Sequence, residues 1–134
     1  EKLGITQDKE ELVLEALDNV GLAHAVDLMP DELSGGMKRR VALARALILK
    51  PRIILYDEPT TGLDPITAKE IIELMRNIQR KYGTASLIIT HDVDCARVIS
   101  RRILLLVDGT NYAEGTFAEL SSSTDPKVEA FFKK

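Results

Sequence analysis

The sequence predicts an α/β fold with a largely parallel sheet. Three short apolar runs have the length and composition of strands that are buried on both faces, as in parallel sheets. These expected strands are Ile53–Asp57, Ser86–Thr90 and Ile103–Val107. Helical segments separate the runs, and this strand–helix–strand alternation indicates crossover connections that place the strands side by side.

Helices are expected before, between and after these strands. Asp8–Val20 has amphipathic spacing and stops at Gly21, and Pro65–Tyr82 begins with a first-turn proline. Asp108–Gly109 is expected to turn the third strand back into a hairpin. The other expected segments are a helix and turn at Leu22–Leu33, helices at Met37–Leu49, Val93–Ser100, Thr116–Leu120 and Asp125–Phe132, and a hairpin strand at Tyr112–Gly115.

The composition fits one globular domain or part of one. The 134 residues are 45% hydrophobic and 29% charged, and a net charge of -3 argues against a nucleic-acid partner. Cys95 is the single cysteine, so no internal disulfide can form. The apolar runs are far shorter than the ~20 residues that span a bilayer, so a membrane role would require a partner. Lys38–Arg40 is interpreted as a solvated helix face.

The first chemical motif is Leu33–Met37, at the expected start of a helix. Its two glycines allow a ligand to approach the backbone closely, and Ser34 can cap the helix and offer a hydroxyl. The N–H groups of a helix start suit a phosphate. The same residues also suit a plain helix-entry loop.

The second motif is the pair Asp57 and Glu58 at the end of the first strand. The carboxyl edge of a parallel sheet is where ligands bind in open α/β folds. There Asp57 could hold a Mg²⁺ shell, and Glu58 could polarise a water for attack on phosphorus. With Pro59 following, the pair also fits an ordinary turn at a strand end.

Two further motifs involve Asp64 and His91. In Thr61–Pro65, Asp64 is expected to cap the following helix, which does not exclude a functional role. His91 directly follows the second strand, where an imidazole can reach a γ-phosphate or an attacking water. A lone histidine is nevertheless more often structural.

The order and spacing of these motifs resemble those of ABC ATPases. Leu33–Met37 resembles the ABC signature, Ile53–Glu58 the Walker B strand with its catalytic glutamate, Gly62–Asp64 the D-loop, and His91 the switch histidine. The resemblance implies an incomplete P-loop NTPase-like three-layer fold that lacks the P-loop strand. Residues 1–50 would then hold part of the helical subdomain, and residues 51–134 half of the catalytic core.

The resemblance also implies a role for each motif, with ATP and Mg²⁺ as cofactors. Glu58 and His91 would be catalytic, and Asp57 would hold Mg²⁺ through water. Asp64 would contribute to the nucleotide site through the D-loop. The residues that would contact the ATP of the opposite subunit of a homodimer are Ser34, Gly35 and Gly36.

Parts of the second half are similar to the Mla-type ATPases, which serve phospholipid traffic between bacterial envelope membranes. This resemblance implies integral-membrane permease partners, no nucleic acid, and a cytoplasmic position on the inner face of the bacterial cell membrane. The residues that carry it are Thr90–Ala96, Asp108–Gly109, Glu114–Phe117 and Asp125–Phe132.

No P-loop of the form Gly-x-x-x-x-Gly-Lys-Ser/Thr occurs in the sequence. The Q-loop of the family is not found either. We therefore expect a shortened or cleaved form of a longer polypeptide, beginning inside the helical subdomain. Because the P-loop supplies most phosphate contacts, we expect the chain alone neither to bind ATP tightly nor to hydrolyse it.

In the family fold, the P-loop strand lies between the strands that correspond to Ser86–Thr90 and Ile103–Val107. Without it, a slot is expected between these two strands. We expect the slot to close by rearrangement or to accept a strand from another copy, because open strand edges invite pairing.

Two alternatives to a transporter subunit remain. One is an ABC-type ATPase that acts in translation or DNA repair, against which the acidic composition and the short Pro65–Tyr82 segment argue. The other is a non-catalytic binding module. Retention of Asp57, Glu58 and His91 argues against it.

Overall fold

The computed structural model describes residues 8–132, so the first residues of the expected 1–50 subdomain lie outside the described part. The described residues up to Ile88 form one compact unit, and those from Ile89 onward form a second. The division into residues 1–50 and 51–134 follows the family's subdomains and stays a prediction. None of the described helices combines the length and apolar character that a membrane span requires.

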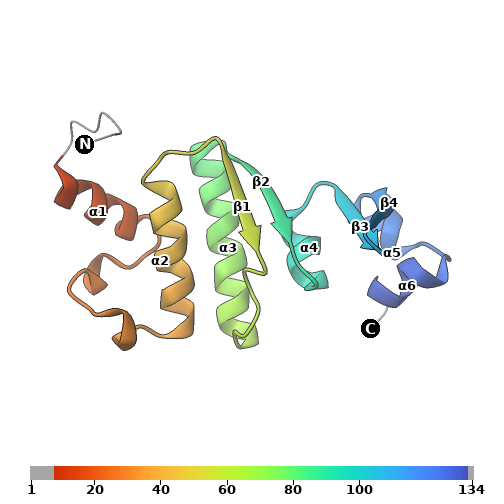
Figure 1. The fold of residues 1–134 in the computed structure, drawn as a ribbon, viewed down its shortest axis with the longest axis horizontal. Helices are drawn as coiled ribbons and strands as arrows, with labels where there is room; N and C mark the ends of the chain where they lie inside the picture. Colours follow the sequence, from red (N-terminus) through yellow and green to blue (C-terminus); the bar gives the residue numbers. More distant parts are fainter. Residues whose placement is uncertain (1–7, 133–134) are drawn as a thin grey trace. The chain divides into compact units, whose positions relative to one another are not determined.

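Helices dominate the first unit, and a polar side chain caps the start of each described α-helix. They are α1 (Lys9–Asp18), 3₁₀ turns at Ala23–Ala25 and Pro30–Glu32, α2 (Gly35–Leu47) and α3 (Pro65–Tyr82) (Figure 1). Asp8 and Ser34 cap α1 and α2 by accepting hydrogen bonds from backbone N–H groups. Because Ser34 is the cap, α2 includes both glycines and begins two residues before the predicted Met37.

The strands of the first unit are β1 (Ile53–Asp57) and β2 (Ala85–Ile89), which form a two-stranded sheet. Their arrows run in the same direction in Figure 1, and α3 connects them. This β1–α3–β2 crossover confirms the predicted parallel α/β arrangement. Helix α3 ends at Gly83, whose φ of 60° is the left-handed conformation expected at a helix stop.

Burial of both faces of these strands was predicted, and this expectation is wrong for one face. Ile54 is 5% exposed, whereas Ile53 and Leu55 are 63% and 72% exposed, and Leu87 of β2 is 56% exposed. Alternate residues of a strand point to opposite faces. In the part of the chain that the structure describes, only the Ile54 face is covered, so the apolar run does not become a fully buried strand.

The second unit contains α4 (Val93–Ile99), the strands β3 (Ile103–Val107) and β4 (Thr110–Gly115), and the helices α5 (Phe117–Ser121) and α6 (Pro126–Phe132). The strands form the predicted antiparallel hairpin. Positive φ at Asp108 and Gly109, 51° and 76°, fits the two-residue turns favoured in hairpins. Leu105, Leu120 and Val128 form the buried core beneath this hairpin.

The strands β2 and β3 belong to different two-stranded sheets. Within the described residues, β2 pairs with β1, and β3 pairs with β4. How the expected slot between them is filled stays a prediction.

Candidate functional site

The start of α2 presents the groups needed to bind an anion. The Ser34 hydroxyl accepts a hydrogen bond of 3.2 Å from the Met37 N–H, and Ser34 and Gly35 are exposed. The first N–H groups of a helix have no partner within the helix and lie at its positive end. This 13-residue helix therefore directs an exposed positive end, with a serine hydroxyl beside it, toward solvent.

Gly36 permits the start of α2 to pack closely against the start of α3. A Cβ atom at Gly36 would lie 2.6 Å from Cγ2 of Thr67, a distance too short for two carbon atoms. A Cβ at Gly35 would meet Leu63 Cδ2 at an ordinary 3.6 Å. The signature-like loop and the segment around Asp64 are thus in direct contact within the first unit.

The backbone after β1 is strained at Glu58. Its φ of 45° is left-handed, a conformation that costs a residue with a side chain on the order of 1 kcal/mol. A turn follows, in which the Thr61 N–H donates to the Glu58 carbonyl at 3.3 Å, and Pro59 occupies the second position that turns favour for proline. Strained residues of this kind cluster at functional sites.

The Glu58 side chain is held by the same turn. The Thr61 hydroxyl donates a hydrogen bond of 3.0 Å to Glu58 Oε2. Glu58 is half-buried, whereas Asp57 beside it is exposed. The end of β1 therefore carries one restrained carboxylate and one exposed carboxylate.

A groove beside β1 reaches Asp57. It has a volume of about 160 Å³ and is lined by α2, β1 and α3, including Arg39, Leu43, Ile54, Asp57 and Ile71. Pockets that enclose a ligand usually measure roughly 300–1,000 Å³. The groove is therefore too small to enclose a nucleotide.

Burial raises the pKa of the Tyr56 hydroxyl in this region to about 12, from an ordinary value at which a phenol is already protonated at neutral pH. It therefore adds no negative charge beside Asp57.

Asp64 caps α3 as predicted. Its Oδ1 accepts from the N–H groups of Ile66 and Thr67, both at 3.0 Å, and its Oδ2 accepts from the Thr67 hydroxyl at 2.5 Å. The Thr67 hydroxyl, followed by the Thr67 N–H, holds the pKa of the Asp64 carboxyl below its usual value. The side chain is therefore an anion at neutral pH, fixed at the start of α3.

His91 lies in the second unit, two residues after Ile89, the last residue of β2. It is exposed, and hydrogen bonds order the backbone after it: the Asp92 N–H donates to Thr90 Oγ1 at 3.0 Å, and Asp92 caps α4. The other candidate residues lie in the first unit, namely Ser34, Gly35, Gly36, Asp57, Glu58 and Asp64.

The described residues contain no group of three or more histidine, cysteine or acidic side chains that could hold a metal ion. A Mg²⁺ ion near Asp57 would therefore rely on water and phosphate oxygens for most of its ligands, which is usual for this cation. The exposed Asp57 carboxylate fits the role of a single protein contact to such an ion.

Sequence reasoning missed the contacts made by two arginines. Arg39 Nη2 donates to the Thr61 carbonyl at 3.1 Å, and Arg40 donates to the Val20 carbonyl and to Glu70 Oε2, each at 3.1 Å. The Arg40 side chain is only 23% exposed. The interpretation of Lys38–Arg40 as a solvated face is therefore wrong for Arg40, which joins α2 to the turn after α1 and to α3. No local signal marks such pairings, because the partners lie 20 to 30 residues apart.

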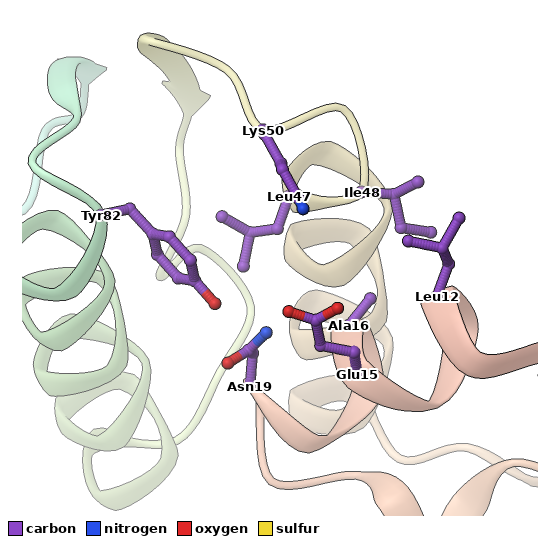
Figure 2. Close-up of a pocket in the computed structure, with 8 residues that line it drawn as sticks. All are labelled: Leu12, Glu15, Ala16, Asn19, Leu47, Ile48, Lys50 and Tyr82. Carbon is purple, nitrogen blue, oxygen red and sulfur yellow. The ribbon is translucent and has the colours of Figure 1, made fainter. Parts of the chain in front are cut away.

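A second, smaller pocket lies between α1, the end of α2 and Tyr82 (Figure 2). Its volume of about 20 Å³ has room for roughly one water molecule. Glu15 of α1, Asn19 at the end of that helix and Lys50 direct polar groups into it. None of the candidate residues lines this pocket, so it is not part of the candidate site.

Comparisons with known proteins agree with the predicted family resemblance. Residues 2–61 match the model of the ABC transporter family. The chain is 42% identical over 123 residues to the intermembrane phospholipid transport system ATP-binding protein MlaF of Haemophilus influenzae, covering 92% of this chain and 47% of that protein. It is 37% identical over 126 residues to the methionine import ATP-binding protein MetN of Corynebacterium jeikeium, covering 94% and 34%.

A solved structure gives the same result at the level of the fold. The chain superposes with a TM-score of 0.73 and 36% identity on a dimeric ATP-binding cassette in a post-hydrolysis state bound to ADP and Pi, covering 87% of this chain and 51% of that one. The fold is therefore that of a P-loop NTPase cassette, incomplete in this chain. The chain is thus similar over most of its length to the ATP-binding subunits of ABC transporters, and it spans about half or less of the length of these relatives.

Proposed function

We propose that the chain is the hydrolytic half of an ATP-binding cassette, in which Glu58 polarises the water that attacks the γ-phosphate. The observation that carries the proposal is the strained backbone of Glu58 at the end of β1, with its carboxylate fixed by Thr61. A carboxylate held in one place can accept a proton from a water molecule and orient it for attack. The relatives named for ATP binding, and the cassette bound to ADP and Pi, support this chemistry.

The other candidate residues have roles that fit their surroundings. The exposed positive end of α2, with Ser34, Gly35 and Gly36, would contact the ATP held by a second copy of the subunit. Asp57 would contact Mg²⁺ through water, Asp64 would hold the start of α3 at the nucleotide, and His91 would reach the γ-phosphate or the attacking water. The dimeric cassette among the structural relatives supports the homodimer.

The groove beside β1 is too small to enclose ATP, and the sequence has no P-loop. Isothermal titration would test the consequence. The 134-residue chain should show no micromolar binding of Mg-ATP, whereas a complete cassette, in which the chain is joined to a P-loop-bearing first half, should bind and hydrolyse it. Failure of the complete cassette to hydrolyse ATP would refute the proposed function.

We further propose phospholipid as the transported substrate, with permease subunits as partners and a position on the cytoplasmic face of the bacterial cell membrane. The name of the MlaF relative and the likeness of the second half to Mla-type ATPases support this. Methionine import by the MetN relative is the competing substrate, at 37% identity.

Co-purification would discriminate the two substrates. A complete cassette expressed at its native level should bring down a permease whose detergent extract contains bound phospholipid. A permease whose transport depends on methionine would refute the assignment.

A further inference from the structure

The turn after β1 contains a residue, Thr61, that holds Glu58 by hydrogen bonds. Thr61 makes two hydrogen bonds to Glu58, one from its N–H to the Glu58 carbonyl at 3.3 Å and one from its hydroxyl to Oε2 at 3.0 Å. The first closes the turn and the second fixes the carboxylate to it. Two attachments to one residue restrict both the backbone and the side-chain rotamer of Glu58.

Arg39 in turn holds Thr61. Its guanidinium donates a hydrogen bond of 3.1 Å from Nη2 to the Thr61 carbonyl. Arg39 lies on α2, one turn after the glycines of the signature-like loop, and 22 residues before Thr61. The contact therefore joins the helix that begins at Ser34 to the turn that carries Glu58.

The start of α2 has little freedom to move away from this turn. Gly36 packs so closely against Thr67 that an added Cβ would clash, and a Cβ at Gly35 would be in ordinary contact with Leu63. These contacts and the Arg39 hydrogen bond fix α2 against residues 61–67. The position of α2 consequently sets the position of Thr61.

We propose that Thr61 is a positioning residue for Glu58 and that Arg39 acts on Glu58 through Thr61. This inference rests on the proposed function, because it assigns to Glu58 the activation of water. Loss of the Thr61 hydroxyl removes one hydrogen bond that holds the Glu58 carboxylate in its position. Misplacement of a reacting group by about 1 Å can slow a reaction by roughly a hundredfold.

The test uses a complete cassette with Thr61→Val, which keeps the shape and removes the hydroxyl. The kcat for Mg-ATP should fall between about tenfold and a hundredfold, with the KM changed by less than about twofold, because binding does not depend on the hydroxyl. Thr61→Ser keeps the hydroxyl and should restore most of the turnover. Thermal melting checks that each variant is folded. If Thr61→Val does not fold, Thr61→Ala replaces it, with the same expected fall in kcat.

Arg39→Ala, like Thr61→Val, should lower kcat. The double variant Arg39→Ala with Thr61→Val should be no slower than Thr61→Val alone, because Arg39 acts on the Glu58 carboxylate through the Thr61 hydroxyl, which Thr61→Val already removes. Thr110→Val is the matched control, since Thr110 donates its hydroxyl to the Val107 carbonyl in the β3–β4 turn. Its turnover should equal that of the unaltered cassette.

The turnover of Glu58→Gln tests the proposed function independently of the positioning role of Thr61. If Glu58→Gln abolishes turnover and Thr61→Val leaves kcat unchanged, the positioning role is refuted and the proposed function stands. If Glu58→Gln retains full turnover, both are refuted. A rise in KM at constant kcat for Thr61→Val would also overturn the positioning role.

Discussion

The packing of Gly36 against Thr67 gives a prediction whose magnitude follows from the structure. In Gly36→Ala, the new Cβ would lie 2.6 Å from Thr67 Cγ2. Thr67 cannot rotate away without cost, because its hydroxyl donates to Asp64 at 2.5 Å. Helix α2 or α3 must therefore shift, and overpacking of this kind costs about 1–3 kcal/mol.

Urea and thermal unfolding of the 134-residue chain would measure this cost. The midpoint of thermal unfolding should fall by roughly 3–12 °C in Gly36→Ala. Gly35→Ala is the matched control, because its Cβ would meet Leu63 at 3.6 Å, an ordinary contact. That variant should be as stable as the unaltered chain or slightly more stable, since alanine favours a helix over glycine.

A second variant tests whether the methyl group of Thr67 causes the loss of stability in Gly36→Ala. Thr67→Ser removes Cγ2 and keeps the hydroxyl that bonds Asp64. In the Thr67→Ser background, Gly36→Ala should cost much less than in the unaltered chain. The reasoning is refuted if Gly36→Ala is as stable as Gly35→Ala, or if Thr67→Ser gives no relief.

Three further outcomes are expected. Ile54→Ala should destabilise the chain by about 2–5 kcal/mol, whereas Leu55→Ser on the exposed face should change its stability by less than about 0.5 kcal/mol; urea unfolding compares them. The Asp64 pKa is lowered on folding, so its stabilising effect is present above the aspartate range and lost as pH falls through it; Asp64→Ala should flatten this acid-side loss in pH-dependent melting. If two copies exchange strands, sedimentation of the chain should show a dimer. Leu87→Lys places a charge on the exposed face of β2 and should lower the fraction of dimer. A dimer fraction that Leu87→Lys leaves unchanged would contradict exchange through this strand.

Much of the fold was predictable because its signals are local. Asp64 followed by Pro65 marks the start of α3, and Gly83 marks its end. These residues act through their own backbone conformation and nearest N–H groups, so neighbouring sequence is sufficient to identify them. The bounds of β1, α3 and β3 accordingly match the predicted ranges.

The features that were missed depend on residues far apart in the chain. The bonds from Arg39 to Thr61 and from Arg40 to Glu70 join separate elements, and no periodicity or spacing reveals them. The exposure of Ile53 and Leu55 has a related cause. An apolar run in the sequence predicts a strand whose two faces can both be buried. Whether each face is buried depends on which other elements pack against it.

In the candidate site too, features with a local sequence signal were predictable, and features that depend on the folded geometry were not. Ser34 and Asp64 were identifiable as caps, and both cap helices in the structure. The strained φ of Glu58 and its bond to Thr61 have no signature in sequence and emerge only from the turn geometry. The catalytic roles of Glu58 and His91 stay predictions.

The central claim is that Glu58 activates water for ATP hydrolysis, and the turnover of Glu58→Gln in a complete cassette tests it most directly. The amide keeps the size of the side chain but cannot accept a proton from water. Release of phosphate should fall by roughly 10²–10⁴-fold, while Mg-ATP binding measured by titration stays unchanged. Phosphate release at the unaltered rate by a properly folded Glu58→Gln cassette would contradict the account.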